Sequence, residues 1–105
     1  MIEAVICTKS KEYVGFSIKG HAGFARNGRD IVCSSVSALT FSFLNSVEEL
    51  TDSTYKLEKG NSGFVQFKFL NKDDKGDLLI RSYVLALMGI SADYGKFFRL
   101  YFKEV

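Results

Sequence analysis

Along this chain the apolar residues first alternate with polar ones and then recur every three or four positions. This sequence of two patterns occurs twice. Residues 1–8 and 13–19 alternate between apolar and polar side chains, which is typical of strands with one buried face. From residue 31 to about residue 50 the apolar residues recur every three or four positions, which is typical of a helix with one apolar stripe. The members of this stripe are Val32, Val36, Leu39, Phe43, Val47 and Leu50. The first half of the chain is therefore predicted to form two strands and a helix.

The second half repeats this arrangement and adds one strand. Strands are predicted at residues 54–57 and 64–70 around a glycine-containing turn, then a helix at 77–88 that Gly89 ends, and a final strand at 97–103. The apolar side of this helix should consist of Leu78, Leu79, Tyr83, Ala86 and Leu87. The order ββαββαβ predicts an α+β fold in which two helices cover a mixed, mostly antiparallel sheet. With 105 residues, the chain (1–105) is expected to form a single domain.

The composition narrows the class of protein. Hydrophobic residues make up 47% of the chain, so it can bury a core. The net charge is only +2 and the charges form no long runs, which does not favour a nucleic-acid partner. The apolar stretches are expected to fall short of the roughly 20 residues that cross a bilayer, so no membrane partner is predicted. Two cysteines are too few for a disulfide scaffold, and no secretory signal is recognised, so a cytoplasmic location is expected.

Residues 20–33 contain the candidate chemistry. They hold the single histidine, His21, and one of the two cysteines, Cys33. A thiol needs a base to become a strong nucleophile at neutral pH. If the helix starts at Ile31, Cys33 is its third residue, where unpaired backbone amides and the helix dipole stabilise a thiolate and are candidates for an oxyanion hole. Asp30 is placed to cap this helix or, as the less favoured alternative, to orient the imidazole.

Simpler interpretations stay open for the same residues. A helical cysteine is commonly a small core residue, and a lone histidine is commonly a polar surface residue. On a helical wheel Cys33 lies about 60° from Val36, the middle of the stripe, so it should emerge at the edge of the buried face. Cys7 is assigned a structural role. Because Cys7, Cys33 and His21 lack the fourth ligand of a zinc site, no metal and no other cofactor is predicted.

Three short motifs resemble a known family: Gly20-His21-Ala22, Gly28-Arg29-Asp30-Ile31-Val32-Cys33 and Ser34-Ser35-Val36-Ser37. They are similar to the signature of the ribosomal-processing cysteine proteases (Prp, YsxB-like), and the resemblance covers the whole chain. It implies an endopeptidase that removes the N-terminal extension of large-subunit ribosomal protein twenty-seven. The resemblance makes His21 the general base, Cys33 the nucleophile and Asp30 a supporting residue. It assigns to substrate binding, or to a loop that moves over the site, Gly20, Gly23, Phe24, Gly28 and Ser37.

The resemblance also implies a homodimer. Phe41 and Leu44 lie off the main stripe of the first helix and suggest such an interface, although packing against the second helix explains them equally well. A second candidate function is a non-catalytic ribosome-associated binding module that uses a mildly basic surface and exposed aromatic residues, Phe97 and Phe98 or Tyr101. A thiol-based redox protein is disfavoured because the chain has no Cys-x-x-Cys pair.

Overall fold

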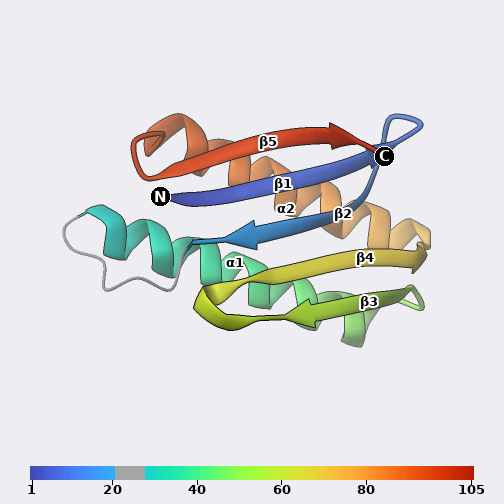
Figure 1. Ribbon diagram of the computed structural model, residues 1–105. Helices are drawn as coiled ribbons and strands as arrows, with labels where there is room; N and C mark the ends of the chain where they lie inside the picture. Colours follow the sequence, from blue (N-terminus) through green and yellow to red (C-terminus); the bar gives the residue numbers. More distant parts are fainter. Residues whose placement is uncertain (21–27) are drawn as a thin grey trace.

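The structure, a computed structural model, describes residues 1–20 and 28–105, with residues 28–30 and 62 described by their backbone alone. Five strands and two long helices follow one another in the predicted order ββαββαβ (Figure 1). The elements are β1 (Ile2–Lys9), β2 (Glu12–Lys19), α1 (Gly28–Leu50), β3 (Thr54–Lys59), the short 3-10 helix η1 (Asn61–Gly63), β4 (Val65–Asn71), α2 (Asp74–Asp93) and β5 (Phe98–Glu104). The α+β fold class is therefore confirmed.

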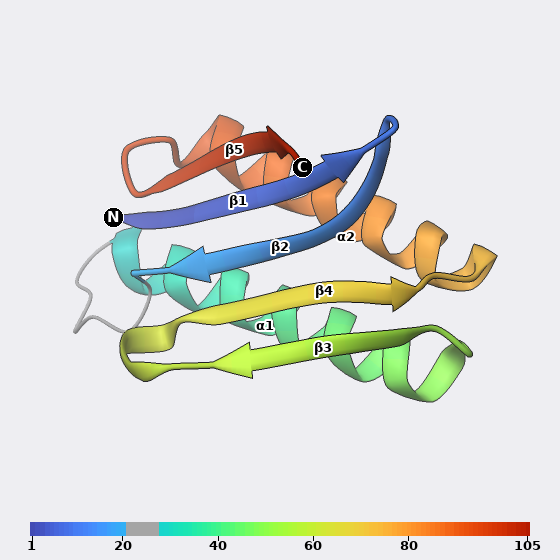
Figure 2. The ribbon, with the colours of Figure 1, turned by 45° about the vertical axis from the view of Figure 1, so that its right-hand side comes forward.

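The five strands form one sheet in the order β3-β4-β2-β1-β5. The pair β1–β5 is parallel and the other three pairs are antiparallel, so the sheet is mixed and mostly antiparallel, as predicted. Both helices lie on the same face of the sheet, and no described helix or strand covers its other face (Figures 1 and 2). We refer to this other face as the open face. The molecule therefore has two layers, with the core between the sheet and the helices.

The first hairpin turns more tightly than the sequence suggested. Lys9 pairs with Glu12, so the connection has two residues, Ser10 and Lys11, and both have positive φ (52° and 66°). Two central residues with positive φ match the twist of the flanking strands, which is why this type of turn is common in hairpins. The register then shifts between Cys7 and Thr8. The predicted alternation along β1 is still observed, because Ile2, Ala4 and Ile6 are buried on the helix side.

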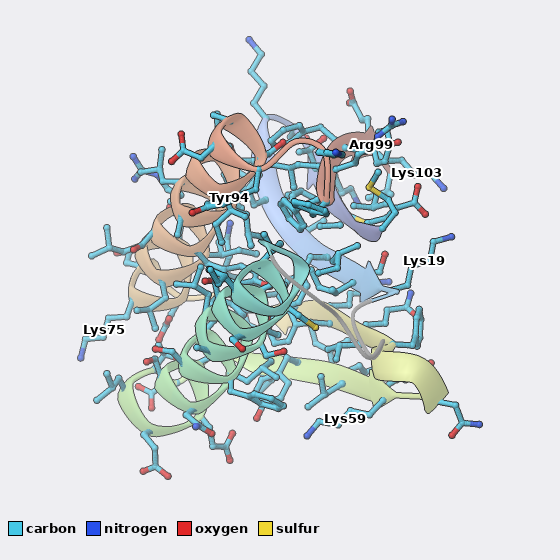
Figure 3. All side chains as sticks on the ribbon, turned by 90° about the vertical axis from the view of Figure 1, so that its left-hand side faces the viewer. Lys19, Lys59, Lys75, Tyr94, Arg99 and Lys103 are labelled. Carbon is cyan, nitrogen blue, oxygen red and sulfur yellow. The ribbon has the colours of Figure 1, made fainter. Side chains whose placement is uncertain are left out.

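The apolar stripe of α1 packs on the sheet largely as predicted. Val32, Val36, Phe43 and Val47 are buried and Leu39 is partly buried against the core. Leu50 is 61% exposed, which contradicts its assignment to the stripe, because the helix ends there. The core is rich in aromatic contacts: the rings of Phe16 and Phe67 stack at 5.3 Å, and that of Phe43 meets both (Figure 3 shows how densely the side chains fill this layer).

The second helix is longer and differently rotated than predicted. It begins at Asp74, after Asp73, whose carboxylate accepts a hydrogen bond from the Gly76 amide at 2.8 Å. Leu78 is 63% exposed, while Ile80 and Val84 are buried together with the predicted Tyr83 and Leu87. Gly76 lies on the buried side as well, and a β-carbon there would collide with the Ser53 hydroxyl.

Gly89 does not end α2, which contradicts the prediction. The helix continues to Asp93, and Ile90 packs against the core beyond the glycine. The amide of Tyr94 then donates to the Ile90 carbonyl at 2.8 Å and closes the last turn. Burial of Ile90 therefore outweighs the modest cost of a glycine inside a helix.

One helix in the described part of the chain is long and apolar enough to cross a membrane. It is the segment Ile31–Leu50 of α1, with a mean hydropathy of 1.3. The expectation that no apolar stretch reaches this length is therefore wrong. Length and hydropathy alone do not distinguish a membrane span from a core helix, and the stripe of α1 packs on the sheet.

Candidate active site

The end of β2 and the start of α1 lie at the same end of the molecule, beside the start of β1 (Figures 1 and 2). The chain between them contains three of the predicted site residues, His21, Gly23 and Phe24, which lie outside the described residues. What the structure places are the two ends of this connection, Gly20 and Gly28.

Gly20 is fixed by two independent constraints. Its φ is +88°, a value that residues with a side chain rarely adopt. A β-carbon at this position would also collide with the backbone carbonyl oxygen of Met1. Gly20 therefore has a structural role: it packs closely against the start of the chain at Met1, and it is the residue directly before His21.

Helix α1 begins three residues earlier than predicted. It starts at Gly28, so Asp30 is its third residue and not the residue that caps it. The prediction of Asp30 as the N-cap is therefore wrong. An acidic residue is favourable in the first helical turn, because it interacts with the positive end of the helix dipole.

The earlier start changes the surroundings expected for Cys33. Cys33 is the sixth helical residue, in the second turn, so its amide falls within the range of intrahelical hydrogen bonding. The amides of α1 without an intrahelical partner are those of its first three residues, 28–30. The predicted oxyanion donors therefore lie about one turn before Cys33 and not at Cys33 itself.

The thiol of Cys33 lies where the helical wheel predicted. Cys33 is half-buried and packs against the core at the edge of the buried stripe, between the exposed Ile31 and Ser34 and the buried Val36. Ser37, a further predicted site residue, is half-buried one turn later on the same helix face. The edge of α1 thus presents one thiol that is partly accessible to a ligand.

The second thiol, Cys7, lies on the opposite face of the sheet. It is half-buried in β1, and it alternates with Ala4 and Ile6, which are buried on the helix side. Cys7 therefore points to the open face, away from α1. The two cysteines therefore lie on different sides of the sheet, Cys33 on the helix side and Cys7 on the open face. Among the described residues, no group of three His, Cys, Asp or Glu side chains is arranged to hold a metal ion.

A buried polar pair holds α1 in place behind Cys33. The Tyr83 hydroxyl of α2 and the Thr40 hydroxyl of α1 are 2.7 Å apart, and Thr40 donates to the Val36 carbonyl at 2.7 Å. The Thr40 proton is used by Val36, so Tyr83 is the donor in the first of these bonds. Burial raises the pKa of Tyr83, so its phenol stays protonated and able to donate. Sequence reasoning missed Thr40, because a threonine within an apolar stripe shows its role only when its partner on another helix is known.

The fold and the site together define a small α+β protein in which a helix-borne cysteine is the candidate nucleophile, the class of the cysteine-dependent hydrolases. The chain belongs to the family of the cysteine protease Prp, whose model matches residues 1–99, and it is therefore a cysteine protease. The family resemblance seen in the sequence motifs is confirmed.

Several relatives are similar over most of their length. The ribosomal processing cysteine protease Prp of Bacillus subtilis is 35% identical over 101 residues, which is 90% of each chain. The protein of the same description from Staphylococcus aureus is 28% identical over 86 residues, 80% of this chain and 81% of its own. The crystal structure of SMU.848 from Streptococcus mutans matches with a TM-score of 0.92 and 25% identity, over 100% of this chain and 96% of the other.

A solved structure of the Staphylococcus aureus Prp protease contains a covalently linked product peptide. It matches this fold with a TM-score of 0.88 over 98% of this chain and 100% of its own, at 24% identity. The two-layer arrangement of this chain is therefore that of a protease of known structure.

Proposed function

We propose that this chain is a site-specific endopeptidase that removes the N-terminal extension of large-subunit ribosomal protein twenty-seven, with Cys33 as nucleophile and His21 as general base. The observation that carries the proposal is the half-buried thiol of Cys33 at the edge of α1, at the end of the molecule where Gly20 leads into His21. The relatives from Bacillus subtilis and Staphylococcus aureus are ribosomal processing proteases, which supports a ribosomal protein as the substrate.

The proposed reaction passes through a thioester. His21 accepts the Sγ proton of Cys33 while the sulfur attacks the carbonyl carbon of the scissile peptide bond. The C–N bond then breaks, and the imidazolium gives its proton to the leaving amine. Water attacks the thioester with His21 as base, which releases the carboxylate and restores the thiol.

Because Cys33 lies in the second turn of α1, we expect deprotonation of its thiol to depend more on His21 than on the helix N-terminus. The stabilising effect of a helix N-terminus falls off within the first turn, so it contributes less at Cys33 than at residues 28–31. Asp30 is three residues before Cys33, and residues at this spacing share a helix face. As Asp30 does not cap α1, we assign it the other role, orienting the imidazole of His21.

Cleavage of a peptide that spans the extension junction tests this proposal. Cys33→Ala is expected to abolish cleavage, because the other thiol, that of Cys7, lies on the open face and away from α1. His21→Ala should lower kcat/KM by about 10²–10⁴-fold, the usual contribution of a general base. Cys7→Ala is the matched control and should keep full activity, since Cys7 lies on the open face. Cleavage that persists in the Cys33→Ala variant would contradict the mechanism.

Of the aromatic residues considered for the non-catalytic binding module, Tyr101 is exposed, but Phe98 is buried in the core, so its predicted exposure is wrong. The binding module also predicts a different behaviour of the thiol. A histidine-activated Cys33 should react with iodoacetamide well below pH 8, faster than Cys7 of the same molecule. Replacing His21 with alanine should remove this difference, because the base is lost. Mass spectrometry of peptides alkylated over a pH series gives both rates at once. Equal rates for the two cysteines at every pH would favour the binding module over the protease.

The assembly and location of the enzyme form part of the same proposal, which takes it to be a cytoplasmic homodimer. Leu44 is buried, so of the two residues considered for an interface only the half-exposed Phe41 remains at the surface. The Lys59 ammonium lies over the ring of Phe41, 5.5 Å from the ring centre, in a cation–π contact. Sedimentation equilibrium of the wild type and of Phe41→Ala gives the oligomeric state, and a monomeric wild type would contradict the dimer.

A further inference from the structure

The open face of the sheet carries an excess of positive charge that the composition conceals. Strand register and exposure place five cations on this face: Lys19, Lys56, Lys68, Arg99 and Lys103. Two carboxylates share it, Glu3 and Glu58. Figure 3 shows Lys19, Arg99 and Lys103 on the side of the sheet away from both helices, whereas Lys75 and Tyr94 lie on the helix side. The net charge of +2 for the whole chain is therefore unevenly distributed.

Three of these cations lie in one row that crosses all five strands. In β3 and β4, Lys56 is directly opposite Lys68; Lys68 pairs with Gly15, Gly15 with Cys7, and Cys7 with Lys103. We call Lys56, Lys68 and Lys103 the lysine row. With strands about 4.8 Å apart, the first two lysines are neighbours, and Lys103 lies about 14 Å further along the row.

The lysine row is not neutralised by its surroundings. Of the five cations only Lys19 forms an ion pair among the described residues, with Glu3 across the strands at 3.6 Å. Like charges directly opposite each other on neighbouring strands are destabilising, so the pair Lys56–Lys68 costs the isolated protein stability. An anionic partner on this face would remove that cost.

The middle of the row is hollow. A shallow cavity of about 200 Å³ lies on this face; its lining is mostly apolar and also includes Gly15 and the polar residues Ser17, Gln66 and Lys68. Gly15 lacks a side chain because a β-carbon there would collide with the backbone of β4, and this absence helps to create the hollow. Tyr101, on β5 in the next row, is 43% exposed. The face thus offers cations for phosphates, polar groups for base edges and one aromatic ring for stacking.

We propose that the open face binds single-stranded RNA, with its phosphates on the lysine row and a base stacked on Tyr101. An acidic protein is the alternative partner. Its carboxylates would pair with the lysines, but such a partner gives no role to the cavity beside Gly15 or to the ring of Tyr101. The choice of RNA rests on the proposed function, because a protease that trims a ribosomal protein meets its substrate beside ribosomal RNA. Helix α1, which carries Cys33, lies on the opposite side of the sheet from the proposed RNA (Figure 1).

Fluorescence anisotropy with a labelled oligouridylate tests the surface. The variant Lys56→Gln/Lys68→Gln/Lys103→Gln should lower affinity about tenfold at moderate salt. It should also make the dependence of log affinity on log salt shallower by about 2, at roughly 0.7 per lost phosphate contact. The matched control, Lys59→Gln/Lys75→Gln/Lys96→Gln, removes the same charge outside the row and should leave both values unchanged. Equal losses in the two variants would overturn the proposal, because they would show a response to net charge alone.

Stacking is tested separately from charge. Tyr101→Ala should lower affinity about tenfold without changing the salt dependence, and Tyr94→Ala, a tyrosine of similar exposure (39%) on the helix side, should have no effect. If polyglutamate competes as well as RNA per unit charge, the partner is an acidic protein and the proposal is overturned. If oligodeoxyuridylate binds with higher affinity than oligouridylate, the choice of RNA is overturned. Cleavage of the junction peptide should be normal in the lysine-row variant. Failure of RNA binding is thereby distinguished from failure of the proposed protease function.

Discussion

Gly20 shows how much of the candidate site depends on one residue without a side chain. Its φ of +88° and its approach to the Met1 carbonyl both exclude a β-carbon. We expect Gly20→Ala to lower the free energy of unfolding by about 1–3 kcal/mol, the usual cost of such backbone strain. It should also lower kcat for the junction peptide, because the residue bonded to His21 is displaced. Urea unfolding and peptide cleavage measure the two effects.

Gly89→Ala is the control for Gly20→Ala, because it also replaces a glycine with alanine. Gly89 lies inside α2, and a β-carbon there would have no neighbour within 4 Å. Alanine should therefore raise stability by about 0.5–1 kcal/mol, because it lowers the backbone entropy lost in the helix, and leave cleavage unchanged. If Gly20→Ala were as well tolerated as Gly89→Ala, the anchoring role of Gly20 would be wrong.

At the scale of the elements, Asp73 joins the start of α2 to the end of α1. Its carboxylate accepts hydrogen bonds from the amides of Gly76 and Asp52 and from the Ser53 hydroxyl, each at 2.8 Å. These bonds, with that from Gly76 the largest contribution, hold the pKa of Asp73 below its ordinary value. A carboxyl group whose pKa is lower in the folded state stabilises the fold above its unfolded pKa, and the benefit disappears as pH falls through the folded pKa.

The stability of the protein should therefore depend on Asp73 mainly at neutral pH. We expect Asp73→Asn to lower the urea midpoint there, and the difference from the wild type to shrink as pH falls below about 4, where the carboxyl group begins to protonate in the unfolded chain. Asp93→Asn removes a carboxylate from the other end of α2 and is the control. A difference between wild type and Asp73→Asn that stays constant from neutral to acidic pH would contradict the role of the charge.

At the scale of the whole molecule, what the sequence predicted correctly depends on local patterns. Alternation along β1 and the three-to-four spacing of α1 are set by neighbouring residues, and both predict the buried faces. The half-buried position of Cys33 follows from the same helical geometry. The start of α2 was missed although its cap is local, since Asp73 accepts from the Gly76 amide. The further bonds that Asp73 accepts from Asp52 and Ser53, 20 or more positions away, could not be seen in the sequence. The lysine row could not be seen either, since it appears only when the register of five strands is known.

The parallel pairing of β1 with β5 has a consequence for how the protein is made. Ile2 and Phe98, which pair in the sheet, are 96 positions apart. A nascent chain on the ribosome therefore carries β1 with one edge unpaired until nearly a hundred residues have been translated. Such an edge is a template for wrong pairing with another chain. Completion of this sheet is thus one of the last events of biogenesis, and β1 is the strand most exposed to aggregation before it.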